Sequence, residues 1–263
     1  MATQLRRMKK EKKISYALLE KKLTHAIQRN SSIKEKIGIA FSGGLDSGIL
    51  GFMLSKKRKD CIFLTVGFPR SPDILRAEKW AKKWKMKWVK KELTQKEIEK
   101  NYARAGKILQ TKDHLQQTLG ALNLSIAQLA KKEKIKKLFV GSGADELFCG
   151  YALFDTCRNS SDACERLRKE KIEKIEEHDV KREVMCGKEY GIQLIAPYLD
   201  EDFAGEAMSF PAHENLKGKY GKLRKNVLRM LGEKMGVPLE IVQEKKKAMQ
   251  YGSGTAKRLQ TVH

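Results

Sequence analysis

The stretch IGIAFSGGLDSGIL, residues 37–50, decides the fold. An apolar run of strand length leads directly into Ser42-Gly43-Gly44, a lone acid follows at Asp46, and a second apolar run comes after it. A strand that ends in small residues and opens a helix leaves backbone N–H groups unpaired and directed at one point, with the helix dipole behind them. The stretch therefore predicts a strand, an anion-binding loop and a helix.

The residues of this loop suit a phosphate chain. Gly43 and Gly44 permit a close backbone approach that a Cβ would block, and Ser42 and Ser47 add hydroxyl donors. The loop is not a Walker motif, because no Gly-Lys pair in the sequence is followed by Ser or Thr. An acid among phosphates is explained if Asp46 holds Mg²⁺, which prefers oxygen ligands. The alternative is an ordinary glycine-rich turn in which Asp46 caps the helix.

Short apolar runs alternate with helical patterns over the first 150 residues. The runs predict strands at 37–41, 61–66, 88–93 and 137–140. Helical patterns lie at 16–27, 47–54, 73–85 and 114–132. Strands of this kind, separated by helices, favour parallel pairing with right-handed crossovers. We therefore predict an α/β fold with a doubly wound parallel sheet. The loops after Phe41 and Val140 fall at the carboxyl edge of that sheet, where ligands of such folds lie.

The character of the chain changes after residue 150. Charged helical patterns follow, interrupted by Pro197, Pro211 and Pro238, and they predict a helical C-terminal subdomain. The expected organisation is a basic N-terminal helical segment at 1–36 and a nucleotide-binding α/β core at 37–150. A helical part at 151–263 then completes the site.

The charge of the chain is extreme for its size. Its 263 residues carry a formal net charge of +23 at pH 7, which attracts polyanions such as RNA, DNA or nucleotides. The alternative is a solvated, lysine-rich surface that selects no partner. No stretch approaches the roughly 20 apolar residues that cross a bilayer, and the basic start lacks the apolar region of a secretory signal. We expect a cytoplasmic protein with no membrane partner.

The cysteines do not form a recognisable framework. Their number is odd and no C-x-x-C pair occurs, which favours free thiols over disulfides or a zinc ribbon. They are Cys61, Cys149, Cys157, Cys164 and Cys186. The last four include three at intervals of seven to eight residues, so an iron–sulfur cluster is the alternative.

Residues 42–47 resemble the ATP-pyrophosphatase, or PP-loop, family, whose motif is written SGGxDS. Three further stretches narrow the resemblance to the C-terminal synthetase domain of asparagine synthetases. VGFPRSPDILRAEKWAKKW at 66–84 is similar to their segment after the second strand, and GSGADELFCGY at 141–151 to their signature. APYLDEDF at 196–203 resembles their PFLD segment. The resemblance runs from about residue 37 to residue 254.

The resemblance implies an ATP-dependent, amide-forming ligase. Such enzymes bind ATP with Mg²⁺, attach AMP to the carboxylate of aspartate or a similar substrate with release of pyrophosphate, and let an amine displace AMP. The residues implied in nucleotide binding are Phe41, Ser42, Gly43, Gly44, Asp46, Ser47, Val66, Gly67, Gly141 and Gly143. Among them, Val66 and Gly67 would border adenine, and Gly141 and Gly143 would let the backbone approach the α-phosphate.

The metal and the catalytic charge are also assigned by the resemblance. Asp46 and Asp145 would coordinate Mg²⁺. The alternative for Asp145 is an N-cap of the short helix that follows it, and both roles can hold together. Lys246 stands six residues before Gly252, as the catalytic lysine of the family precedes its glycine. If the alignment is shifted by one residue, Lys247 is the catalytic lysine instead. The alternative is that these lysines form a basic, solvated run with no catalytic role. Lys225 and Arg229 match a K-x-x-L-R pattern of the family and would support the site or bind polyphosphate.

Several positions depart from the family pattern. Ser142, which we count among the catalytic positions, stands where the family has a glutamate on the acceptor side, and Gln193, Ile195 and Glu244 depart as well. We therefore expect recognition of the acceptor substrate to differ from that of the family, whereas the ATP-binding positions match it. The chain begins Met1-Ala2-Thr3 and leaves no room for a glutaminase domain, so we expect nitrogen from ammonia, a separate glutaminase subunit or another amine.

Two other functions compete. A tRNA-modifying enzyme that adenylates a base is favoured by the net charge and by KKWKMKWVKK at 82–91, whose tryptophans, with Trp80, could stack on bases. Those tryptophans also fit a protein core, and the C-x-x-C pairs of the thiolation relatives are missing. A non-catalytic nucleotide sensor, or a subunit that needs a partner, is disfavoured because Asp46, Asp145 and Lys246 are intact.

Overall fold

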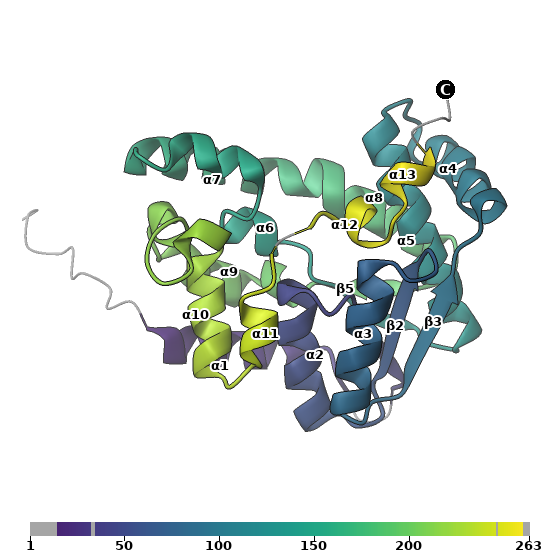
Figure 1. Cartoon of the computed structure of the whole chain (residues 1–263), viewed down its shortest axis with the longest axis horizontal. Coiled ribbons are helices and arrows are strands. Elements are labelled where there is room, and N and C mark those ends of the chain that lie inside the picture. The colour runs from purple at the N-terminus through teal and green to yellow at the C-terminus, as the bar shows by residue number, and fades with distance from the viewer. Residues whose placement is uncertain (1–14, 33–34, 246, 260–263) are drawn as a thin grey trace, which may run out of the picture.

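A computed structural model of the chain describes residues 15–32, 35–245 and 247–259 (Figure 1). Its strands form one parallel sheet in the order β3-β2-β1-β4-β5. The strands are β1 (Ile37–Ala40), β2 (Ile62–Gly67), β3 (Trp88–Glu92), β4 (Lys137–Phe139) and β5 (Gln193–Ile195). The chain starts in the middle of the sheet and winds outward first to one edge and then to the other. The predicted doubly wound α/β fold is confirmed, and its topological switch point lies between β1 and β4.

Helices cover the sheet and extend beside it. They are α1 (Tyr16–Arg29), α2 (Leu45–Lys57), α3 (Pro72–Lys83), α4 (Gln95–Leu109), α5 (His114–Lys132), α6 (Ala144–Leu147), α7 (Ser161–Ile175), α8 (Lys181–Lys188), α9 (Glu201–Met208), α10 (Asn226–Lys234), α11 (Leu239–Val242), α12 (Met249–Gly252) and α13 (Ala256–Leu259). Short turns of 3₁₀ or π type are η1 (Ala152–Cys157), η2 (Glu176–Val180), η3 (Pro197–Leu199), η4 (Ala212–Asn215) and η5 (Gly221–Leu223). Within the described part of the chain, no helix has the length and apolar composition needed to span a membrane.

The two faces of the sheet are buried against different helices. Successive side chains of β2 point to opposite faces, as the pleat requires. Phe63 packs in one apolar cluster with Trp80 of α3 and residues of α2, whereas Leu64 packs in another with Ala127 of α5. Figure 1 shows α2 and α3 in front of the strands. Burial on both faces explains why the central strands β1 and β2 read as continuous apolar runs, whereas the edge strand β3 carries Lys90, Lys91 and Glu92.

Two elements of the sheet layers were not predicted. β5 lies in the region expected to be helical, and its Leu194 is in register with Leu138 of β4. α4 begins with a capping box, in which Thr94 and Glu97 satisfy each other's backbone N–H groups. The C-terminal part therefore supplies the fifth strand in addition to helices.

The first helix joins the C-terminal helices. α1 has the predicted apolar stripe, and its Leu19, Leu23 and Ile27 are buried. Figure 1 shows α1 beside α9 and α10 at one side of the sheet. Arg29, in the last turn of α1, pairs with Asp200 and lies 3.3 Å from Asp202. The amino-terminal and carboxyl-terminal parts of the chain thus pack on one another.

The five cysteines are buried free thiols. Cys149, Cys157 and Cys164 share one apolar cluster. Across residues 15–32, 35–245 and 247–259, no group of three or more His, Cys, Asp or Glu side chains is arranged to hold a metal ion, so the iron–sulfur alternative has no site there.

Candidate active site

The loop after β1 is closed on itself by its hydroxyl groups. The N–H of Ser42 donates to Oγ of Ser47 at 3.1 Å, and the two hydroxyl oxygens are 3.0 Å apart. Gly43 has φ +69°, a conformation that favours glycine, and a Cβ there would lie 2.9 Å from backbone and side-chain carbon of Arg76. Gly44 caps α2, so the first turn of this helix begins at the loop. The predicted strand, tight loop and helix are all present.

A cavity of about 730 Å³ opens at the carboxyl ends of β1, β2 and β4. The predicted site residues that line it are Phe41, Ser42, Gly44, Asp46, Ser47, Val66, Gly141, Ser142, Gly143 and Asp145. Gly43 and Gly67 lie in the same loops but are not among its lining residues. Lys246 falls outside the described residues, while its neighbours Lys245 and Lys247 both line the cavity. The structure therefore gathers most of the predicted residues at one place.

The two predicted metal ligands meet at one ammonium group, which we call the Lys225 triad (Asp46, Asp145 and Lys225). Nζ of Lys225 donates to the carboxylate oxygens of Asp46 at 2.7 and 2.8 Å, and it lies 2.8 Å from Oδ1 of Asp145. The Lys225 side chain is 1% exposed. A buried cation of this kind is stable only when it is paired, and here two carboxylates from different loops do so.

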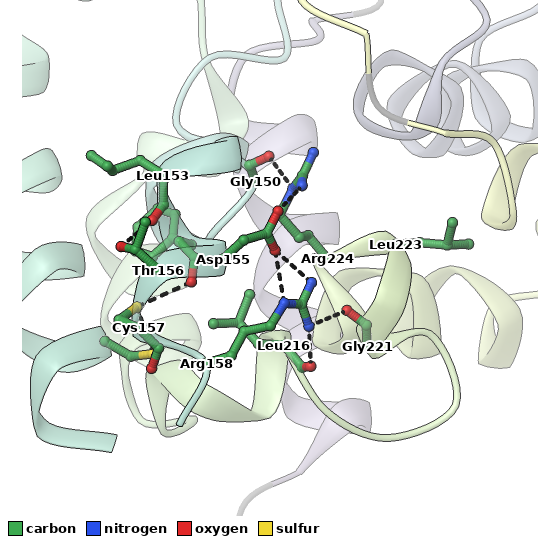
Figure 2. Close-up of polar contacts among 12 residues, drawn as sticks. Gly150, Leu153, Asp155, Thr156, Cys157, Arg158, Leu216, Gly221, Leu223 and Arg224 are labelled. Carbon is green, nitrogen blue, oxygen red and sulfur yellow. Dashed lines mark hydrogen bonds and ion pairs between the residues drawn. The ribbon is translucent and has the colours of Figure 1, made fainter. Parts of the chain in front are cut away.

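An unusual backbone turn delivers Lys225 to the triad. Arg224 and Lys225 have φ values of +60° and +54°, and each such residue costs on the order of 1–3 kcal/mol unless its surroundings hold it. Figure 2 shows the network that does so, in which Asp155 accepts from both Arg158 and Arg224. Arg224 also donates to the carbonyl of Gly150 at 3.0 Å. This hydrogen bond connects the turn at Arg224 and Lys225 to the end of the 141–151 stretch, which resembles the family signature.

Arg229 acts as a support for this turn. It is fully buried, and its guanidinium donates to the carbonyls of Arg224 at 2.7 Å and Leu223 at 3.1 Å. It also donates to the carbonyls of Val242 and Glu244, which precede the lysine run. Burial lowers the pKa of Arg229 to about 10. Of the two roles expected for Arg229, these contacts match support of the site.

The PFLD-like segment at 196–203 contacts both the loop after β1 and the loop after β4. The hydroxyl of Tyr198 donates to the carbonyl of Asp46 at 2.9 Å, and burial raises the pKa of Tyr198 well above its usual range. The hydroxyl therefore stays protonated and able to donate. A Cβ on Gly143, which has φ +92°, would lie 2.4 Å from Cδ2 of Leu199. Close packing against this segment thus requires the glycine.

A second set of carboxyl groups lies around Ser142, in the loop after β4. We call it the Glu183 cluster (Ser142, Glu146, Asp179 and Glu183), and all four residues line the cavity. Oγ of Ser142 lies 2.7 Å from each carboxylate oxygen of Glu183, and the hydroxyl donates to that carboxylate. Tyr151 donates to the carboxylate of Glu146. Burial raises the pKa values of Glu146 and Glu183 to about 7.

An ion pair holds the segment before the lysine run. Arg76 of α3 pairs with Glu244 at 2.7 Å and with Asp73 at 2.5 Å, and its Nε lies 3.4 Å from the carbonyl of Ser42. Glu244 is one of the positions that depart from the family pattern. Its pairing with Arg76 joins the lysine run to the phosphate loop.

Sequence reasoning missed several of these residues. Glu183 lies in a charged helix with no motif around it, and Arg76 and Arg224 belong to long basic stretches. The departure at Ser142 was the only signal that pointed toward Glu183. The tryptophans considered for base stacking are part of the core: Trp80 is 2% exposed, and Trp84 and Trp88 are partly buried against the same apolar cluster.

The donors of the Lys225 triad suit a hard divalent cation. Asp46 and Asp145 already converge on one cationic atom, and Mg²⁺ is commonly held by one or two carboxylates together with substrate phosphates. Because the described residues contain no cluster of three such ligands, phosphate oxygens would have to complete the shell.

Comparison with known proteins relates this chain to one enzyme family. The family model described as asparagine synthase matches residues 18–189 and 160–262. A candidate glutamine-hydrolysing asparagine synthetase of Methanocaldococcus jannaschii is 28% identical, with 93% of this chain and 50% of that protein covered. The glutamine-hydrolysing asparagine synthetase of Gallus gallus is 26% identical, with 89% and 43% covered. The chain thus spans half or less of the length of these relatives.

A solved structure also aligns with this chain. The U34-tRNA thiolase NcsA from Methanococcus maripaludis, determined with its 4Fe-4S cluster, gives a TM-score of 0.42 at 14% identity, with 94% of this chain and 82% of that chain covered.

Proposed function

Because the chain belongs to the asparagine synthase family, we propose that it is an ATP-dependent amide-forming ligase. It would adenylate the carboxylate of aspartate or a similar small acid, release pyrophosphate, and let an amine displace AMP. Free ammonia, ammonia released by a separate glutaminase subunit, or another amine would supply the nitrogen. The physical need is simple, since a carboxylate is a poor acyl donor until one of its oxygens becomes part of a good leaving group.

One observation carries this proposal. Asp46 and Asp145, from the loops after β1 and β4, converge on Lys225 inside the cavity that the phosphate loop lines. This places hard oxygen ligands and a buried cation at the switch point of the sheet, where a nucleotide is expected.

Each part of the nucleotide then has a proposed partner. The N–H groups of the 42–47 loop and the N-terminus of α2 bind the pyrophosphate portion. Val66 and Gly67 border adenine, and Gly141 and Gly143 leave room for the α-phosphate. Lys246, or Lys247 in the neighbouring register, stabilises the charge that develops on the α-phosphate and acyl carbon.

Asp46 and Asp145 would hold Mg²⁺ on the triphosphate. The ion, when bound, would supply charge neutralisation and orient the pyrophosphate leaving group. Lys225, which pairs with both carboxylates, would keep their mutual repulsion low before the metal and the nucleotide bind.

Isotope exchange between pyrophosphate and ATP tests the proposal. The wild-type protein is incubated with Mg²⁺, ATP and each of a panel of carboxylic acids, beginning with L-aspartate. We expect exchange that depends on the acid, because adenylation is reversible. Absence of exchange with every acid, by protein that is folded, would contradict the proposed function.

The net charge of +23 favours a second candidate, a PP-loop enzyme that adenylates a tRNA base. It predicts tight tRNA binding with a steep salt dependence. The burial of Trp80 leaves that tryptophan out of any stacking platform, so only the charge supports this candidate. Conversion of ATP to AMP that requires tRNA and not a small acid would favour it.

A further inference from the structure

A carboxylate is present on the acceptor side although Ser142 replaces the family glutamate. It belongs to Glu183 of α8, 41 residues further along the chain, and both of its oxygens lie 2.7 Å from Oγ of Ser142. Glu183 lines the same cavity as the Lys225 triad. A residue from a neighbouring helix thus places its charged group where the loop itself has only a hydroxyl.

We propose that Glu183, held in place by Ser142, accepts the proton of the incoming amine. This assignment rests on the proposed amide-forming function. It makes Glu183 a catalytic residue that the sequence motifs do not indicate and gives Ser142 a positioning role.

The groups around Glu183 leave it able to take up a proton near neutral pH. Burial raises the pKa of Glu183 most, to about 7. The hydrogen bond from Ser142 and the charge of Arg182 lower this pKa, and the charges of Asp179 in η2 and Glu146 in α6 raise it. Arg182 is also committed elsewhere, to Asp179 at 2.5 Å, Gln116 at 2.7 Å and Asn123 at 3.1 Å. A base with a pKa near the working pH is well matched to proton transfer.

The step balances with the groups that the proposal names. The amine nitrogen attacks the acyl carbon of the adenylate and a C–N bond forms. The C–O bond to AMP breaks, AMP leaves with the bonding electron pair, and the excess proton on nitrogen passes to a carboxylate oxygen of Glu183. The proton is later released to solvent, which returns Glu183 to its ionised form.

The surroundings of the Glu183 cluster also suit an amine. A second hollow of about 610 Å³ shares Glu146, Tyr151, Ile175 and Asp179 with the main cavity. Two members of the cluster, Glu146 and Asp179, therefore lie where the two hollows meet. Carboxylates at this point attract a positively charged or hydrogen-rich nitrogen and repel the triphosphate.

The test separates adenylation from amide formation. Glu183→Gln and the wild type are assayed for pyrophosphate–ATP exchange and, with ammonium chloride as the amine, for amide product; the acid is the one that supports exchange, L-aspartate first. We expect exchange within about twofold of wild type and amide formation lowered by about 100-fold. The loss should fall on kcat and not on the KM of the acid. At a constant concentration of unprotonated ammonia, the rise of amide formation with pH through about 7 should disappear.

Glu189→Gln is the matched control, because Glu189 caps the same helix and pairs with Arg104 at the surface. It should leave both activities unchanged. Equal loss of exchange and amide formation in Glu183→Gln, or undiminished amide formation, would overturn the assignment. A wild type without exchange would instead overturn the proposed function, and this assignment with it.

Discussion

The two sides of the loop after β4 are built in different ways. On one side, Asp145 joins Asp46 and Lys225, all at positions that match motifs of the family. On the other side, Ser142 departs from the motif and contacts Glu183 of α8. The comparison teaches that the proposed nucleotide side uses residues at motif positions, whereas on the proposed acceptor side a neighbouring helix supplies the carboxylate that the motif position lacks.

The largest effect is expected from a substitution on the proposed nucleotide side. Asp46→Asn should lower pyrophosphate–ATP exchange by about 1,000-fold, because one of the two proposed metal ligands is lost and the charge partner of Lys225 at 2.7 Å becomes neutral. Amide formation should fall equally. Asp162→Asn, at an exposed position in the first turn of α7, is the control. Exchange at the wild-type rate in Asp46→Asn would show that Asp46 does not serve adenylation.

Gly150→Ala tests the packing around the triad. A Cβ at Gly150 would lie 2.0 Å from Oδ1 of Asp145 and 2.2 Å from Cε of Lys225, so both side chains must move. We expect exchange to fall by about 100-fold and the free energy of unfolding to fall by about 2 kcal/mol. Thermal denaturation and the exchange assay measure the two effects.

Gly205→Ala is the matched control for that substitution. Nothing lies within 4 Å of its added Cβ, and the residue is in α9. The free energy of unfolding should rise by about 0.5 kcal/mol with exchange unchanged. If Gly150→Ala behaved in the same way, the triad would not be closely packed.

The pH profile separates the two sides without a substitution. Burial raises the pKa of Glu183 from its ordinary value of 4.5 to about 7, so its ionised, proton-accepting form grows as pH rises through that value. At a constant concentration of unprotonated ammonia, amide formation should rise by about tenfold per pH unit below pH 7 and level off above it. The rate of pyrophosphate–ATP exchange should not show this rise below pH 7. The same rise in both activities would place the titrating group on the nucleotide side instead.

The smallest effect is expected in the network of Figure 2. Asp155→Asn weakens its pairs with Arg158 and Arg224, which are partly exposed, so the free energy of unfolding should fall by less than about 1 kcal/mol. Exchange should fall by about threefold, because the turn that carries Lys225 is less firmly held. Glu170→Gln, which removes a surface pair with Lys174, should change neither quantity.

Local patterns explain what the sequence could predict. The strand, loop and helix of residues 37–50 are determined by neighbours in the chain, through apolar runs, two glycines and the start of α2. The four longer apolar runs were recognised as strands for the same reason. These features place the phosphate loop and the switch point, and hence most of the nucleotide side.

Contacts between distant segments explain what it could not. β5 has three residues, as β4 does, but its first residue is exposed and only its last is buried, so its identity as a strand depends on pairing with β4. Glu183 reaches Ser142 only because α8 packs beside that loop. The tryptophans at 80, 84 and 88 look equally suited to a core or a surface, and only the packing of α3 and β3 against β1 and β2 decides between them.

Calorimetric titration of ATP with MgCl₂ into the wild type and into the Asp46→Asn/Asp145→Asn double variant tests the central claim, that the carboxylates of the Lys225 triad hold the metal-bound triphosphate. We predict saturable binding at one site in the wild type and no measurable heat in the double variant, whose thermal denaturation should still be cooperative. Equal binding by both proteins would contradict the account.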